Sequence, residues 1–141
     1  MEENKSIILR GYSKTDEMFI HNSFYRGIKH HHGQHFQDIK FCITQLIELF
    51  TIKIVADAID ENVIYSYIIC NSKDNTIVYA YTKENFRNLG FFNYLKNQTG
   101  ISTNKYYYCF PSMASRHMEA RQGAIYRPYY LLNFLFNGVY E

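Results

Sequence analysis

The stretch that decides the fold is NTIVYAYTKENFRNLGFFNYLKNQ, residues 75–98. Its first part, 76–82, is rich in β-branched and aromatic residues, which is typical of a buried strand. A polar turn follows, and Gly90 then opens a helix-like segment that begins with Phe91. A helix N-terminus presents unpaired N–H groups and the positive end of the peptide dipoles, so this order of elements predicts an anion site. Arg87 adds a permanent positive charge at the same corner.

Composition indicates one globular domain over residues 1–141, because 47% of the residues are hydrophobic and 18% are aromatic. No apolar run approaches the roughly 18 residues of a membrane span, so no membrane partner is expected. Three widely spaced cysteines argue against a disulfide framework and favour a reducing, cytoplasmic location. A net charge of +2 is too small to indicate nucleic acid by itself, but it suits an anionic ligand at one basic spot.

Before the opening stretch, the pattern predicts a strand and two helices. Residues 6–12 are typical of a first strand. Apolar side chains recur every fourth position from Ile20 to Ile28, which indicates a helix that ends near Gly27. A polar, histidine-rich loop is expected over 29–33. A second helix over 35–50 has the clearest apolar stripe in the chain.

From Thr51 the apolar period changes to two, and short turns separate three strands that should therefore be antiparallel neighbours. These strands are expected over 51–58, 63–70 and 76–82. A strand over 105–110 returns after a helix, so it should lie parallel to the third of them. A short helix over 112–122 and one or two strands over 124–136 complete the chain. The order predicts an α/β (α+β) fold with a mixed, mostly antiparallel sheet and helices on both faces.

This element order resembles the GNAT superfamily of acyl-CoA-dependent N-acyltransferases. The family signature, Arg/Gln-x-x-Gly-x-Gly/Ala at a strand-to-helix corner, is matched by Arg87 and Gly90 in their strand–turn–helix context. The element order resembles the family over nearly the whole chain, and the motif over about 76–98. Two segments look most like the small GNAT-like proteins of tailed phages and prophages. They are VYAYTKENFRNLGFFNYL, around the motif, and residues 19–26. The Mom family of phage DNA-modification enzymes is one relative of that type.

The resemblance implies that acetyl-CoA lies in a V-shaped opening between the fourth and fifth strands. It places the pantetheine arm along the fourth strand, at Tyr79, Ala80, Tyr81 and Thr82. It places the pyrophosphate on the backbone of the signature turn, at Arg87, Asn88, Leu89, Gly90, Phe91 and Phe92. The chain departs from the family at the third small position, which is Phe92 here. The Phe92 ring must therefore find room away from the phosphate.

Acyl transfer from a thioester needs a neutral amine, a polarised carbonyl and a proton for the leaving thiolate. A backbone N–H near Tyr81 is the candidate that polarises the carbonyl. A tyrosine hydroxyl or Ser112 is the candidate acid, because both lie after the fifth strand or inside the opening. Asp57 and Glu61 are the nearest candidate bases, and Glu84 is a third. For each of the three acids, a solvated surface position is the favoured interpretation.

Other side chains admit a plainer interpretation beside the functional one. His30, His31, His32 and His35 could ligate a metal, but a polar loop beside the acceptor groove is the favoured reading, and no metal is expected. The cysteines are typical of small buried apolar residues. The tyrosines, with Arg116, Arg121 and Arg127, could stack on nucleic acid bases, but aromatic packing on a small sheet is the favoured interpretation.

Three classes of function follow. The first is an N-acetyltransferase that uses acetyl-CoA and an amine acceptor, which could be a small molecule, a protein or a nucleic acid base. The second is a phage-type enzyme that modifies nucleic acid bases on the same fold, in the host cytoplasm. The third is a catalytically silent binding or inhibitor protein, which Phe92 and the lack of an evident base both favour. The final strands could pair across a homodimer.

Overall fold

The structure, a computed structural model, describes residues 6–32, 36–102, 105–110, 123–127, 129–131 and 134. The strands are β1 (Ile7–Gly11), β2 (Thr51–Asp57), β3 (Ile64–Asn71), β4 (Thr76–Thr82), β5 (Tyr106–Tyr108) and β6 (Ala124–Tyr126). The helices are α1 (Glu17–His32), α2 (Phe36–Leu49) and α3 (Phe91–Thr99), with 3-10 turns η2 (Lys14–Asp16), η3 (Ser72–Asp74) and η4 (Glu84–Phe86).

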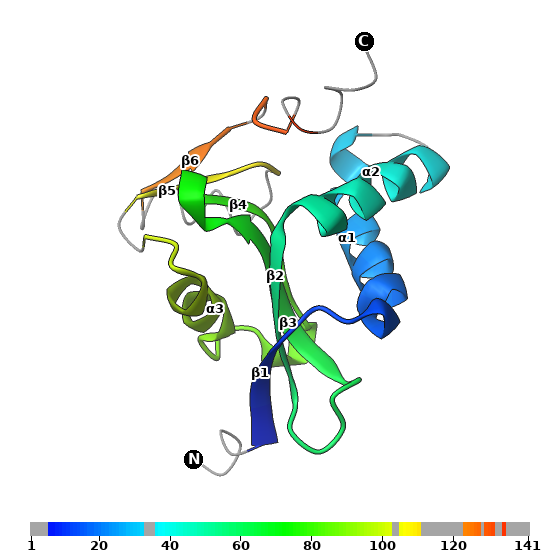
Figure 1. The fold of residues 1–141 in the computed structure, drawn as a ribbon, viewed down its shortest axis with the longest axis vertical. Helices are drawn as coiled ribbons and strands as arrows, with labels where there is room; N and C mark the ends of the chain where they lie inside the picture. Colours follow the sequence, from blue (N-terminus) through cyan, green and yellow to red (C-terminus); the bar gives the residue numbers. More distant parts are fainter. Residues whose placement is uncertain are drawn as a thin grey trace.

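The strands form one sheet in the order β1-β2-β3-β4-β5-β6. Neighbours from β1 to β4 are antiparallel, whereas β5 is parallel to β4 and β6 is parallel to β5. Helices α1 and α2 lie on one face of the sheet and α3 lies on the other (Figure 1). The predicted mixed, mostly antiparallel sheet with helices on both faces is thus confirmed.

Each face of the sheet buries its own apolar cluster, because alternate residues of a strand point to opposite faces. On the α1 and α2 face, Ile20 and Phe24 of α1 are fully buried against the strands. On the α3 face, Leu95 packs against Ile68 and Ile77. The two clusters hold the helices at fixed places on the sheet.

Helix α1 is longer than the sequence indicates. It continues through 29–32, so the loop predicted there is wrong for these residues. The apolar pattern ends at Ile28, and polar histidines give no core-facing signal that a helix goes on. None of the helices that the structure describes is long and apolar enough to cross a membrane. The helix predicted over 112–122 lies outside the described residues.

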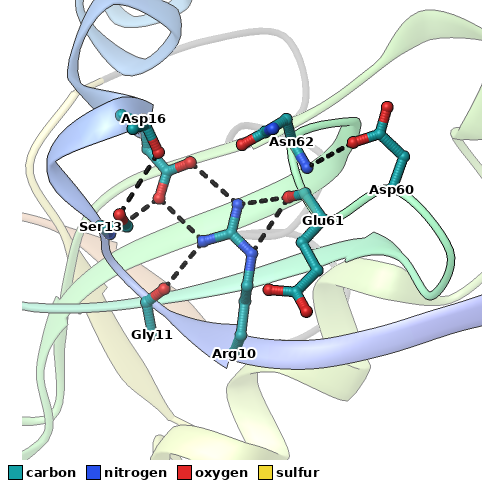
Figure 2. Close-up of polar contacts among 8 residues, drawn as sticks. Arg10, Gly11, Ser13, Asp16, Asp60, Glu61 and Asn62 are labelled. Carbon is teal, nitrogen blue, oxygen red and sulfur yellow. Dashed lines mark hydrogen bonds and ion pairs between the residues drawn. The ribbon is translucent and has the colours of Figure 1, made fainter.

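Arg10 fastens the start of α1 and the β2–β3 turn to β1 (Figure 2). Two of its guanidinium nitrogens donate to the two carboxylate oxygens of Asp16, each at 2.8 Å. Its Nη2 and Nε also donate to the carbonyl oxygen of Glu61, at 2.6 and 3.2 Å. Asp16 is only 2% exposed and accepts a further bond from the Ser13 N–H. Since the carboxylate is fully bonded, the pair can be buried without an unpaired charge.

A close contact between α1 and β4 passes through Gly27. The Tyr79 ring of β4 stacks on Phe24 with centroids 4.2 Å apart and planes 4° apart. Its hydroxyl reaches the α1 backbone where a Cβ on Gly27 would overlap it. Glycine inside a helix normally costs stability, so its presence here is explained by the space that Tyr79 occupies.

We expect Gly27→Ala to destabilise the protein by about 1–3 kcal/mol, because the new methyl group overpacks against the Tyr79 hydroxyl. At an open helix position, the same change would instead stabilise by up to about 1 kcal/mol. Urea denaturation measures the difference. Gly11→Ala is the matched control, since nothing lies within 4 Å of a Cβ built there. A neutral or stabilising Gly27→Ala change would contradict this packing.

Candidate functional site

β4 is paired with β3 along its whole length, but with β5 only at its start. The two parallel pairs are Thr76 with Tyr107 and Ile77 with Tyr108, and the Cys109 N–H makes a last bond to the Ile77 carbonyl at 3.2 Å. Beyond Ile77, no described strand pairs with β4 on this side. Within the described residues, pairing between β4 and β5 therefore ends before the C-terminal half of β4, where the family resemblance places the V-shaped opening.

A β-bulge lies where the strands separate. Ile69 of β3 pairs with Tyr79, but the next residue, Cys70, pairs with Ile77, so Val78 is an extra residue in β4. Val78 and Tyr79 consequently both pack on the α1 and α2 face. A bulge bends its strand and increases the local twist. We infer that this bend turns β4 away from β5.

The backbone groups on the side of β4 away from β3 belong to Ala80 and Thr82. The Lys83 N–H donates to the Tyr65 carbonyl oxygen at 2.8 Å across the β3–β4 ladder. Because antiparallel bonding alternates between residues, Ala80 and Thr82 must then point their N–H and C=O groups away from β3. The Thr82 carbonyl accepts a bond from Arg87 Nε at 2.9 Å. Among the described residues, none bonds the backbone of Ala80 or the Thr82 N–H on this side, so they form an unpaired strand edge within that part of the chain.

The turn after β4 has the form of an anion site. Asn88 and Gly90 adopt left-handed φ angles of 68° and 88°, which brings the chain sharply into α3. The first bond inside α3 runs from the Tyr94 N–H to the Gly90 carbonyl at 3.0 Å. The N–H groups of 91–93 precede it, and the cap residue Gly90 has no side chain to bond them. These donors lie at the positive end of the helix dipole.

Phe92 packs under α3 and against the sheet. Its ring centroid lies 6.5 Å from that of Tyr106, and the Lys96 ammonium lies 4.9 Å from the Phe92 centroid. Burial lowers the pKa of Lys96 and raises the pKa of Tyr106 to about 12. The ring thus has a place in the α3 core, which accommodates the residue where the signature has a small side chain.

Tyr65 supports both ends of the turn. Its ring stacks on Phe86, the last residue of η4, with centroids 4.3 Å apart. It also lies nearly parallel to Phe91, the first residue of α3, with centroids 6.4 Å apart. The Tyr65 hydroxyl donates to the Asp57 carboxylate at 2.6 Å. This contact between Asp57, Tyr65 and the turn has no signal in the sequence, since it joins three separate elements.

Asp57, a predicted catalytic residue, is bound within the β2–β3 turn. It accepts bonds from the Tyr65 hydroxyl and from the N–H groups of Ile59 and Asp60. These bonds, with that of Tyr65 as the largest, lower the pKa of Asp57. A carboxylate with a lowered pKa is a weaker base, so this geometry favours a positioning role. Ser112, another predicted catalytic residue, lies outside the described residues.

The side chains of Tyr79 and Tyr81 join Tyr67 on the α1 face. Tyr81 packs on Tyr67 and meets Phe19 edge-on, with centroids 5.5 and 5.8 Å apart. The Tyr67 hydroxyl is hydrogen-bonded to Ser23 Oγ at 2.7 Å. Burial raises the pKa of Tyr79 to about 12 and the pKa of Tyr67 well above its ordinary value. Tyr67 and Tyr79 are therefore neutral phenols at physiological pH.

The remaining candidates do not assemble into a second site within the part of the chain that the structure describes. Cys70 and Cys109 are buried, as predicted, and burial raises the pKa of Cys109 to about 12. No three described His, Cys, Asp or Glu side chains could hold one metal ion. The Arg127 guanidinium carbon lies 4.2 Å from the Tyr107 ring centroid, and Arg127 Nη1 donates to Thr76 Oγ1 at 3.1 Å. Arg116, Arg121, His35 and the side chains of His30, His31 and His32 lie outside the description.

Comparisons with known proteins find likeness in structure alone. No protein-family model and no curated sequence matches the chain. A possible acetyltransferase from Clostridium difficile 630 superposes with a TM-score of 0.52 and 12% identity, over 96% of this chain and 90% of that one. The fold is GNAT-like. A GNAT family acetyltransferase from Staphylococcus aureus has a TM-score of 0.44 and 16% identity, over 86% of this chain and 84% of that one.

We expect Asp57→Asn to reduce stability at neutral pH and to have much less effect in acid. The folded pKa lies below the ordinary value of 3.8, so the stabilisation is present above that value and is lost as the pH falls through the folded pKa. Urea denaturation at pH 7 and at about pH 2.5 measures the change. Tyr65→Phe should remove most of the same pH dependence. An equal loss of unfolding free energy at both pH values would show that the charged, hydrogen-bonded form of Asp57 does not stabilise the fold.

Proposed function

We propose that the protein is an acyl-CoA-dependent N-acyltransferase that moves an acetyl group from acetyl-CoA to an amine. The observation that carries this proposal is the meeting of two features at the end of β4. One is the strand edge at Ala80 and Thr82, which is not paired with β5. The other is the uncapped N-terminus of α3 beside Arg87. The GNAT-like fold supports the proposal.

The chemistry of coenzyme A explains why both features are needed. Its pantetheine arm carries amide groups, which can pair with an exposed strand edge as an added strand does. Its pyrophosphate needs N–H donors and positive charge, which residues 91–93 and Arg87 would supply. Since the edge leads directly into the turn, one extended molecule could contact both.

The residues around the edge would act on the reacting groups. The bound cofactor supplies an activated acyl group as a thioester. The amine nitrogen bonds to the acyl carbon and loses one proton to water, the carbon–sulfur bond breaks, and the sulfur takes one proton from the acid, which regains it from water. A β4 N–H near Tyr81, such as that of Ala80 or Thr82, would donate to the thioester oxygen. Tyr81 and Ser112 are the candidate acids for the sulfur. Asp57 would keep the turn in place through Tyr65.

The other two classes draw less support from the site. The silent binding protein was favoured by Phe92, whose ring has a place under α3. The nucleic acid modifier was predicted from Arg116, Arg121 and Arg127; Arg127 is held by Tyr107 and Thr76, and the other two lie outside the described residues. The relation of this protein to phage proteins is an inference from the sequence resemblance.

Isothermal titration with acetyl-CoA tests the proposal. We expect micromolar binding, and we expect Arg87→Glu to weaken it at least about tenfold, because an anion then faces the pyrophosphate. Lys73→Glu makes the same charge change in η3, at the other end of β4, and should leave the affinity unchanged. Absence of binding at millimolar acetyl-CoA would refute the proposed acyltransferase function. Equal effects of the two variants on the affinity would refute the assignment of the pyrophosphate site to the turn at Arg87.

A further inference from the structure

We propose that the acceptor amine also carries a negatively charged group, a carboxylate or a phosphate, which binds Arg26 on the α1 side of the opening. The inference rests on the proposed function and narrows its acceptor to one chemical class. It is carried by the face that α1 presents to β4 and by the charges on that face.

The face of α1 that is turned to the tyrosines ends in Arg26. Phe19, Asn22, Ser23 and Arg26 follow the spacing i, i+3, i+4 and i+7, which places them on one side of a helix. Phe19 of this stripe meets Tyr81 edge-on, and Ser23 bonds the Tyr67 hydroxyl at 2.7 Å. Arg26 continues the stripe by one turn and is exposed. Arg26 is therefore on this side of α1, next to Gly27, where the Tyr79 hydroxyl contacts the helix.

Two arginines from different elements act on one hydroxyl. The positive charges of Arg87 and Arg26 both oppose the rise in the pKa of Tyr79, and Arg26 also acts on Tyr67. Ion pairs among the described residues involve Arg10, Lys14 and His21, so no described carboxylate neutralises Arg26 or Arg87. In the proposed function, Arg87 faces the cofactor phosphates. Among the described residues, Arg26 is left as a positive charge without an ion-pair partner on the side of α1 that meets β4.

An amine that carries only positive charge would be repelled by Arg26. Like charges oppose binding and slow the approach of a ligand, whereas a carboxylate or phosphate can form paired bonds with a guanidinium group. The partly exposed rings of Phe19 and Tyr81 offer an apolar surface for the rest of the molecule. The acceptor class is therefore a small amine with an anionic group and an apolar or aromatic body, and polyamines are excluded.

Four amines test this inference with acetyl-CoA, by the release of the coenzyme A thiol. Tyrosine carries a carboxylate, tyramine O-phosphate carries a phosphate, tyramine carries no anion and spermidine carries only positive charge. We expect kcat/KM for tyrosine or tyramine O-phosphate to exceed that for tyramine at least about tenfold, and spermidine to be the poorest. The better of the two anionic amines identifies the anion. In Arg26→Gln, the ratio of kcat/KM for the better anionic amine to kcat/KM for tyramine should fall toward one. In the control Lys73→Gln, this ratio should stay as in the wild type.

Acetyl-CoA titration of the same proteins separates this inference from the proposed function. If wild type binds acetyl-CoA but shows no preference for an anionic amine, or acetylates none of the four, the acceptor class is wrong while the cofactor site stands. A preference that survives in Arg26→Gln would also overturn the assignment. If acetyl-CoA does not bind, both proposals fail.

Discussion

β4 has one residue more than its partner β3 between Ile77 and Tyr79, and the geometry of the site depends on this bulge. Val78 takes a place on the α1 face beside Tyr79, and we infer that β4 bends there. Pairing with β5 ends after Ile77, so the backbone groups of Ala80 and Thr82 point away from β3 with no described strand beside them. The same strand then leads into the uncapped N-terminus of α3.

The two faces of the sheet support different halves of the site. On the α3 face, Tyr65 stacks on both ends of the turn and is fixed by Asp57, so the turn is held without any contact to a ligand. On the α1 face, Tyr79 fits against the helix only because position 27 is glycine. Aromatic rings lose little conformational entropy when they are ordered, which suits them to rigid walls.

Local patterns made much of the fold predictable from sequence. The apolar run of β4, Gly90 and the following helix predicted the strand–turn–helix corner, and crossover rules predicted the parallel β5. The Val78 bulge could not be predicted, because the order Val-Tyr-Ala-Tyr suits an unbroken strand equally well. The Asp57–Tyr65 bond could not either, since Asp57 looked like a surface acid until the turn, β3 and α3 were placed together. Arg26 has helical spacing in the sequence, but only the packing of α1 shows which face meets β4.

The most direct test of the site is an amide NMR titration of the labelled protein with coenzyme A. A ligand that spans the strand edge and the turn should shift the N–H signals of Ala80, Thr82 and residues 91–93 together. Ile69, whose backbone lies within the β3–β4 ladder, should change little. Shifts confined to the turn would contradict the strand edge as the pantetheine site. Shifts elsewhere on the surface, or none at millimolar coenzyme A, would contradict the site as a whole.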